Sequence, residues 1–216
     1  LKGMNSTIDL IYGTEYQTAT SFQETLEQFI DSQTNHLSLY QLTIEPNTIF
    51  YKKELKLPNE DQIEGMERLA RQMLESNGYQ QYEVSSWSRP GFESRHNLNY
   101  WQFGDFLGLG PGAHSKITVG PEITRFRKIK PLNGYIAKQT IADHTIIQGE
   151  ELDMDLAMNL LRIKDGILPD HLGVELPKSF LKKYQLGVKE GLLLEDKIGA
   201  TARGYQYLNE TIKLFF

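Results

Sequence analysis

The alternation of apolar and polar residues predicts a strand, a helix and a second strand in the first 45 residues. Residues 7–12 form an apolar run that ends at Gly13, as a short buried strand does. One helical face of the segment that follows carries Phe22, Leu26, Phe29 and Ile30. Residues 36–44 are rich in β-branched and aromatic side chains, which favours another strand. A strand, a helix and a strand in this order predict a parallel βαβ unit.

The middle of the chain continues this mixed pattern. An apolar stripe between Asn59 and Asn77 predicts a second helix, which Gly78 would end. Residues 82–87 alternate in the manner of a strand. The fold class expected for this part is α/β, and α+β for the whole chain.

Beyond about residue 145 the pattern changes to short helices. Helical patterns cover residues 151–163, 177–184, 188–193 and 205–216, and residues 192–199 resemble a small hairpin. Helices followed by a two-stranded wing predict a compact winged-helix-like domain. We therefore expect two domains, residues 1–145 and residues 146–216.

Composition and charge narrow the function classes. The 216 residues are 39% hydrophobic and 24% charged, with a net charge of -5, which is typical of a globular protein. The sequence shows neither a membrane-spanning run nor a secretion signal. Residues 151–216 hold nine Lys and Arg against ten Asp and Glu, whereas a nucleic-acid reader is normally basic. We expect a cytoplasmic protein without a nucleic-acid partner.

The chain has no cysteine and only five histidines. The lack of thiolates excludes disulfides, cysteine nucleophiles and cysteine-held iron–sulfur clusters in this chain. The histidines are scattered, and no two stand at the spacing of a helical metal site. No metal ligand is therefore predicted.

A glycine-rich turn spans residues 108–114. Gly108, Gly110 and Ala113 match the dinucleotide fingerprint G-x-G-x-x-G/A, which requires a helix next. Residues 115–119 are β-like instead, so the pattern favours a tight turn packed on a sheet. A third option is that the bare backbone lets a flat ligand or the adenosine of a cofactor approach closely.

Residues 96–101 place His96, Asn97, Tyr100 and Trp101 close together. Such a group can present an imidazole to heme iron beside aromatic faces that stack on a macrocycle. By local pattern alone, an aromatic strand with a hydrogen-bonded histidine is favoured.

Two further segments carry charge. Residues 125–130 interleave four cations with two apolar residues, which favours a strand with one solvated face over a cradle for carboxylates or phosphates. Asp9 stands at the end of an apolar strand, where a buried carboxylate needs a partner. A pair of ribose hydroxyls, an arginine or a helix N-terminus could each be the partner of this carboxylate.

Several segments, in order along nearly the whole chain, resemble one family. They are Ile8–Gly13 with Gln17-Thr18, Tyr40–Thr48, Gly78–Glu83, His96–Trp101, Leu107–Ser115 and Ala200–Gly204 with Asn209. The family is the oxygen-independent coproporphyrinogen III oxidases (HemN) and their relatives. Thr14-Glu15 departs from the Leu-Pro that the family has after its first segment here. The segments at residues 40–46 and 96–101 resemble the HemW branch, which is regarded as a group of heme chaperones.

The resemblance implies the last strands of a partial (β/α) radical-SAM barrel, followed by the small helical domain. It also implies that the whole protein holds S-adenosylmethionine and a [4Fe–4S] cluster on a Cys-x-x-x-Cys-x-x-Cys motif, which this chain lacks. The chain is thus expected to be a C-terminal part that begins at about the fifth barrel strand, needs no cofactor of its own and is inactive alone.

By position in the family pattern, Asp9 would contact the cofactor ribose and Thr43 would offer backbone to S-adenosylmethionine. His114 falls where the oxidase branch has an apolar residue that contacts this cofactor. His96 would be the heme-linked residue of the chaperone branch, with Tyr100 or Trp101 flanking the ring.

Two functions follow from the resemblance. The first is heme binding and delivery to heme-accepting proteins, which the segment at His96 favours. The alternative is an oxidoreductase activity, the oxidative decarboxylation of coproporphyrinogen III in porphyrin biosynthesis. A winged-helix nucleic-acid module is a third reading, against which the charge balance argues.

Overall fold

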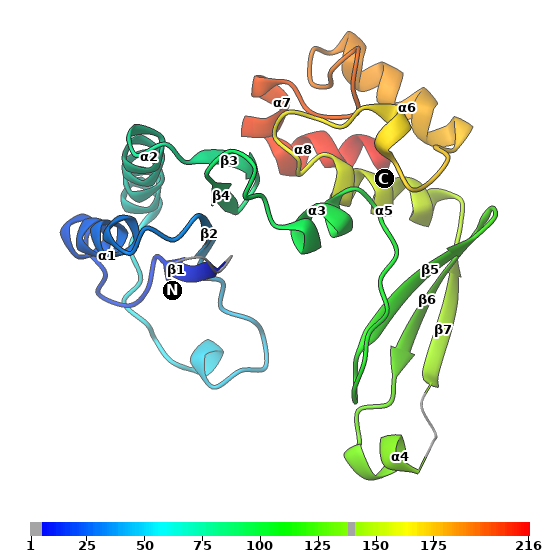
Figure 1. The fold of residues 1–216 in the computed structure, drawn as a ribbon, viewed down its shortest axis with the longest axis horizontal. Coiled ribbons are helices and arrows are strands. Elements are labelled where there is room, and N and C mark those ends of the chain that lie inside the picture. Colours follow the sequence, from blue (N-terminus) through cyan, green and yellow to red (C-terminus); the bar gives the residue numbers. More distant parts are fainter. Residues whose placement is uncertain (1–5, 138–140) are drawn as a thin grey trace. The chain divides into compact units, whose positions relative to one another are not determined.

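The computed structural model describes residues 6–137 and 141–216, and the chain divides into two compact units, Leu1–Ser94 and Arg95–Phe216 (Figure 1). Residues 1–5, where no secretion signal is predicted, lie outside the described residues. No helix among the described residues is long and apolar enough to span a membrane. The domain boundary predicted at residues 145 and 146 falls inside a strand of the second unit, β7 (Ile141–Ile147). Ile147 is buried in one hydrophobic cluster with the helices that follow it.

The first unit contains a four-stranded sheet. Its strands are β1 (Thr7–Tyr12), β2 (His36–Gln41), β3 (Gln80–Glu83) and β4 (Ser86–Ser88), in the order β1-β2-β4-β3. β1 and β2 are parallel and joined through helix α1 (Ala19–Asp31), which confirms the predicted βαβ unit. The single strand predicted at residues 82–87 is instead the end of β3 and the start of β4, separated by a turn at Val84 and Ser85. The turn is closed by side chains, because the Glu83 carboxylate accepts from the Ser85 N–H at 3.1 Å.

Two helices cover one face of this sheet (Figure 1). α1 begins at the N-cap Thr18, and α2 (Glu60–Ser76) begins at the N-cap Asn59. Their apolar stripes pack with the sheet in a core of Tyr12, Phe22, Leu26, Phe29, Leu37, Leu39, Met66, Ala70, Leu74, Tyr79 and Trp87. A short 3-10 helix, Phe50–Lys52, lies in the loop between β2 and α2.

The face of the sheet opposite the helices carries Asp9. Ile8, Leu10 and Tyr12 of β1 pack toward the helices, and strand residues alternate between faces. Asp9 therefore points to the other side, where it is exposed. The expectation of a buried carboxylate is wrong, because the face that Asp9 occupies is not covered by either helix.

The buried histidine His36 lies on the same face of the sheet, beside Thr7. The His36 ring nitrogens lie 2.7 Å from the Thr7 hydroxyl and 2.7 Å from the Tyr82 hydroxyl. Only 5% of His36 is exposed. Burial lowers the pKa of His36, although Asp9 and Glu93 act in the opposite direction.

This burial predicts an acid-sensitive first unit. Above the unfolded-state pKa, about 6.5, His36 is neutral in both states and favours neither. Below it, the unfolded chain takes up a proton that the folded chain does not, so the free energy of unfolding falls. We expect the denaturant midpoint to drop between pH 7.5 and pH 5.5. His36→Gln should be less stable at pH 7.5 but should show a smaller drop, and an equal drop in both proteins would contradict the prediction.

The second unit contains an antiparallel sheet of order β5-β6-β7. β5 (His114–Val119) pairs with β6 (Glu122–Lys128), and the short helix α4 (Leu132–Ile136) stands between β6 and β7. The strand predicted from residue 125 onward is therefore confirmed as far as Lys128.

Helices form the remainder of the second unit. They are α3 (Arg95–Trp101), α5 (Glu150–Leu160), α6 (Lys178–Lys189), α7 (Ala202–Gln206) and α8 (Leu208–Ile212), with 3-10 helices at Pro169–His171 and Lys213–Phe215. The helices predicted at residues 177–184 and 188–193 are replaced by the single helix α6, which ends at Lys189. The predicted closing helix is broken at Tyr207, whose backbone leaves the helical region.

The predicted hairpin at residues 192–199 is reduced to one antiparallel bridge, between Leu193 and Ala200. The Tyr184 hydroxyl holds this segment, because it accepts from the Gly199 N–H at 2.9 Å and lies 2.7 Å from the Lys197 carbonyl. Burial raises the pKa of Tyr184 to about 12. The mixed α/β class is thus confirmed. The predicted two-stranded wing is instead a turn that the Tyr184 side chain of α6 holds in place.

Candidate functional site

The segment that begins with His96 is a helix, α3, and the aromatic strand favoured by local pattern is wrong. Leu98 and Trp101 stand three residues apart and pack against the core of the second unit. This spacing fits a helical period and outweighs the strand preference of the aromatic residues. His96 and Tyr100 stand four residues apart, so they lie over one another on the helix surface.

His96 presents an accessible imidazole. The residue is exposed, and its ring meets the Tyr100 ring edge-on, with 5.0 Å between the ring centroids. Among the described residues its ring nitrogens make no hydrogen bond or ion pair. A neutral imidazole held in this way can bind a metal ion that comes with a ligand.

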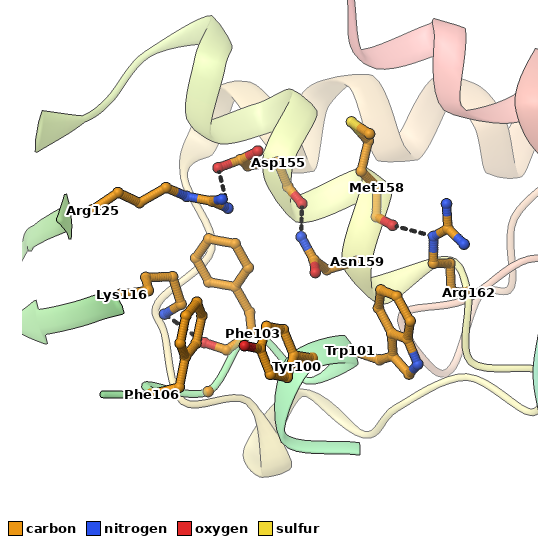
Figure 2. A pocket seen from close by; sticks show the side chains of 11 residues that line it. Tyr100, Trp101, Phe103, Phe106, Lys116, Arg125, Asp155, Met158, Asn159 and Arg162 are labelled. Carbon is orange, nitrogen blue, oxygen red and sulfur yellow. Dashed lines mark hydrogen bonds and ion pairs between the residues drawn. The ribbon is translucent and has the colours of Figure 1, made fainter. Parts of the chain in front are cut away.

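Tyr100 and Trp101 line a cavity of about 270 Å³ within the second unit (Figure 2). Tyr100 also stacks on Phe106, with 4.4 Å between the ring centroids. The other lining residues come from the sheet, from α5 and from the loops beside them: Phe103, Gly104, Phe106, Lys116, Arg125, Asp155, Met158, Asn159 and Arg162. The cavity therefore combines aromatic walls with three cations and one carboxylate.

Two of these cations are paired. The Lys116 ammonium is almost fully buried and lies 3.0 Å from the Asp105 carboxylate and 3.0 Å from the Phe103 carbonyl. Partial burial acts to raise the pKa of Asp105, but hydrogen bonds from Thr118 and Lys116 outweigh it and lower the pKa. Arg125 lies 2.8 Å from Asp155, whose pKa is raised because burial outweighs the attraction of Arg125.

The glycine turn is a tight turn, as the sequence favours. Strand β5 follows it, so the helix that a dinucleotide site needs is replaced by a strand. A side chain at Gly108 would place its Cβ 2.1 Å from the His114 carbonyl oxygen, and Gly110 and Gly112 have positive φ angles. His114 is exposed at the start of β5.

Thr43 and Asp9 belong to the first unit. Thr43 follows β2 and lines a largely apolar cavity of about 350 Å³ together with Thr14, Glu15, Leu42, Ile44, Glu45, Thr48, Phe50 and Leu55. Asp9 stands opposite Ser38 on the edge strand β1 and does not line this cavity. The two residues therefore occupy different places on the same sheet.

Metal-ligating residues do not converge in the described part of the chain, where no three His, Asp or Glu residues lie close enough to hold a metal ion. The sequence has no cysteine. Since iron–sulfur clusters are held chiefly by thiolates, the residues present do not fit such a cluster.

Sequence reasoning found one side of the 270 Å³ cavity and missed the other. Tyr100, Trp101 and Arg125 were singled out by their neighbours in the sequence, whereas Lys116 and Arg162 were not. No local pattern marks Arg162, because it meets Trp101 only through the packing of α3 against α5.

Heme chaperones are among the known proteins that the chain resembles in sequence. The heme chaperone HemW of Haemophilus influenzae is 36% identical over the whole chain, and that of Buchnera aphidicola is 34% identical over 98% of it. The heme chaperone HemW of Escherichia coli is 32% identical over 96% of the chain. Over nearly its whole length, the chain is similar in sequence to the HemW heme chaperones. It spans 57% to 58% of the length of these HemW proteins, and no protein-family model matches it.

A solved structure supports the fold. The coproporphyrinogen III oxidase HemN of Escherichia coli, described as a radical SAM enzyme, matches with a TM-score of 0.69 over 98% of this chain and 54% of its own. At 20% identity the match shows the fold alone. The resemblance to HemN and HemW read from the sequence is thereby confirmed.

Proposed function

We propose that this chain is the heme-binding part of a heme chaperone of the HemW kind, with His96 as an axial ligand of the heme iron. The observation that carries the proposal is the pairing of an exposed, unbonded imidazole with the ring of Tyr100 on one face of α3. An imidazole is a common axial ligand, and the aromatic ring adds apolar contact with the macrocycle.

The relatives favour a chaperone over an oxidase. The HemW proteins are 32% to 36% identical to the chain, whereas the HemN oxidase is 20% identical. In this proposal heme is cargo, which the whole protein would pass to a heme-accepting protein. A cytoplasmic location remains a prediction from the sequence.

Hemin titration tests the proposal. We expect the Soret band of hemin to shift and sharpen when the chain is added, because an imidazole replaces water at the iron. The titration should saturate at about one hemin per chain, as a single axial site predicts. A Soret band that stays the same as that of free hemin would contradict heme ligation.

We further propose that Asp9 and Thr43 contact S-adenosylmethionine in the full-length protein. Asp9 lies on the face of the sheet that the helices leave uncovered, and Thr43 lines the cavity that follows β2. In α/β sheets, ligands bind beyond the carboxyl ends of the strands. Thr43 lies just beyond the carboxyl end of β2, and this position supports its proposed contact with the cofactor. His114 lines neither the cavity beside Thr43 nor that beside Tyr100, so its cofactor contact stays a prediction from the sequence.

Substituting Asp9 should weaken this cofactor contact. A carboxylate that accepts hydrogen bonds from two ribose hydroxyls contributes roughly 1.5–3 kcal/mol. Asp9→Asn keeps the shape but removes the charge, so we expect the affinity of a full-length protein for S-adenosylmethionine to fall about tenfold or more. Equilibrium dialysis measures it, with Asp31→Asn on the exposed end of α1 as the control. Unchanged affinity in Asp9→Asn would show that Asp9 does not contact the ribose.

A further inference from the structure

The 270 Å³ cavity holds one arginine whose charge no carboxylate neutralises. The Arg162 Nε–H donates to the Met158 carbonyl at 3.0 Å, and the guanidinium lies over the Trp101 ring, 5.1 Å from its centroid (Figure 2). Among the described residues Arg162 makes no ion pair. Its two terminal nitrogens are therefore available to a ligand, in the fork that matches a carboxylate.

The other two cations of the cavity are each balanced by a carboxylate. Arg125 is paired with Asp155, and Lys116 is paired with Asp105, which does not line the cavity. With Asp105 counted, the three cations of the lining face two carboxylates, and the charge of Arg162 is left unbalanced. Such a surplus favours an anion, and the partly closed walls strengthen its attraction.

The walls select the rest of the ligand. Tyr100 and Phe106 stack face to face, and Trp101 lies beneath Arg162, so the lining offers flat apolar surfaces next to the cation. A cavity of about 270 Å³ is just below the range of roughly 300–1,000 Å³ that encloses a drug-sized ligand. It therefore does not enclose a large flat molecule. It suits an alkyl side chain at the edge of such a molecule, provided that the side chain ends in a carboxylate.

Tyr100 connects this cavity to His96. The same ring that lines the cavity lies 5.0 Å from the His96 ring. We infer that the cavity binds a carboxylate side chain of a tetrapyrrole, with Arg162 as the anchor. This inference rests on the proposed function, in which His96 holds the iron of the same tetrapyrrole.

Metal-free protoporphyrin IX separates the anchor from the iron ligand, because it offers carboxylates and no iron. Its binding is followed by fluorescence anisotropy, next to that of its dimethyl ester, which lacks the charges. We expect the wild-type chain to bind the free acid about tenfold more tightly than the ester, as one charge-assisted pair predicts. Arg162→Gln should reduce the affinity for the acid to that for the ester. Arg162→Lys should fall between the two, because it keeps the charge and loses the fork.

The matched control is Arg203→Gln, since Arg203 is exposed on α7 of the same unit and does not line the cavity. It should leave both affinities unchanged. Equal affinity of the wild-type chain for acid and ester, or no binding of either, overturns the inference without any variant. The inference is also overturned if Arg162→Gln still binds the free acid more tightly than the ester, as the wild-type chain does.

The outcomes for heme are distinct. If the acid is preferred through Arg162 but hemin shows no Soret shift, the anchor stands and ligation by His96 fails. If hemin shows a Soret shift that needs His96 but acid and ester bind alike, the proposed function stands and the anchor fails.

Discussion

Replacing His96 with alanine is expected to abolish the Soret shift that hemin shows with the wild-type chain. An imidazole is a common axial ligand of heme iron, and the His96 ring meets the Tyr100 ring with 5.0 Å between the ring centroids. Without it, only apolar contacts and carboxylate pairing remain to hold hemin. We expect the affinity for hemin to fall at least about tenfold, as the loss of one strong polar interaction predicts. Absorbance titration measures both effects.

His144→Ala is the matched control. His144 is also exposed, stands on β7 and lies against Phe126 with 6.3 Å between the ring centroids. Like His96, it is accessible and has an aromatic neighbour. Its neighbour Phe126 does not line the 270 Å³ cavity, whereas Tyr100 does. If both variants lose the shift equally, hemin binds histidines without selection, and if neither loses it, the axial ligand is a different residue.

Replacing Gly204 with alanine is expected to destabilise the second unit strongly. Gly204 is buried in α7, and a Cβ there would lie 2.0 Å from the carbonyl oxygen of Leu192 and 2.9 Å from its carbonyl carbon. These are backbone atoms in a segment held by the Tyr184 hydroxyl, so they cannot move away freely. Overpacking of this kind costs about 1–3 kcal/mol and occasionally more. Thermal unfolding should show a midpoint lower by several degrees.

Gly173→Ala provides the comparison for this prediction. A Cβ at Gly173 would meet its nearest atom at 3.9 Å, and the residue does not have a positive φ angle. The substitution should leave the midpoint unchanged or raise it slightly, because alanine restricts the unfolded chain. Equal midpoints for Gly204→Ala and Gly173→Ala would mean that the loop at Leu192 yields without cost.

The sequence was most informative where a pattern is local. The spacing of Phe22, Leu26 and Phe29 predicted α1, and the parallel pairing of β1 with β2 followed from it. The helix α3 was missed because its aromatic and asparagine residues disfavour a helix on their own. Packing of Leu98 and Trp101 on the core decided the matter, and that packing is not a local property.

The candidate site divides in the same way. His96 and Tyr100 are neighbours on one helix, so a short motif sufficed to single them out. Arg162 lies 61 positions beyond Trp101, the ring that it covers (162 − 101 = 61), and only the fold of the second unit joins them. The apolar run of β1 predicts a buried strand, whereas the helices cover only one of its faces and Asp9 is exposed on the other.

The position of β1 at the end of the sheet has a practical consequence for experiments on Asp9. Among the described residues β1 pairs with β2 alone, so its other edge offers free N–H and C=O groups to a second molecule. A charged side chain on such an edge strand opposes association between copies, and Asp9 is the only charged residue of β1. Asp9→Asn would therefore favour self-association of this chain, an effect separate from the weaker cofactor binding expected of the full-length protein. Light scattering at the working concentration separates the two effects.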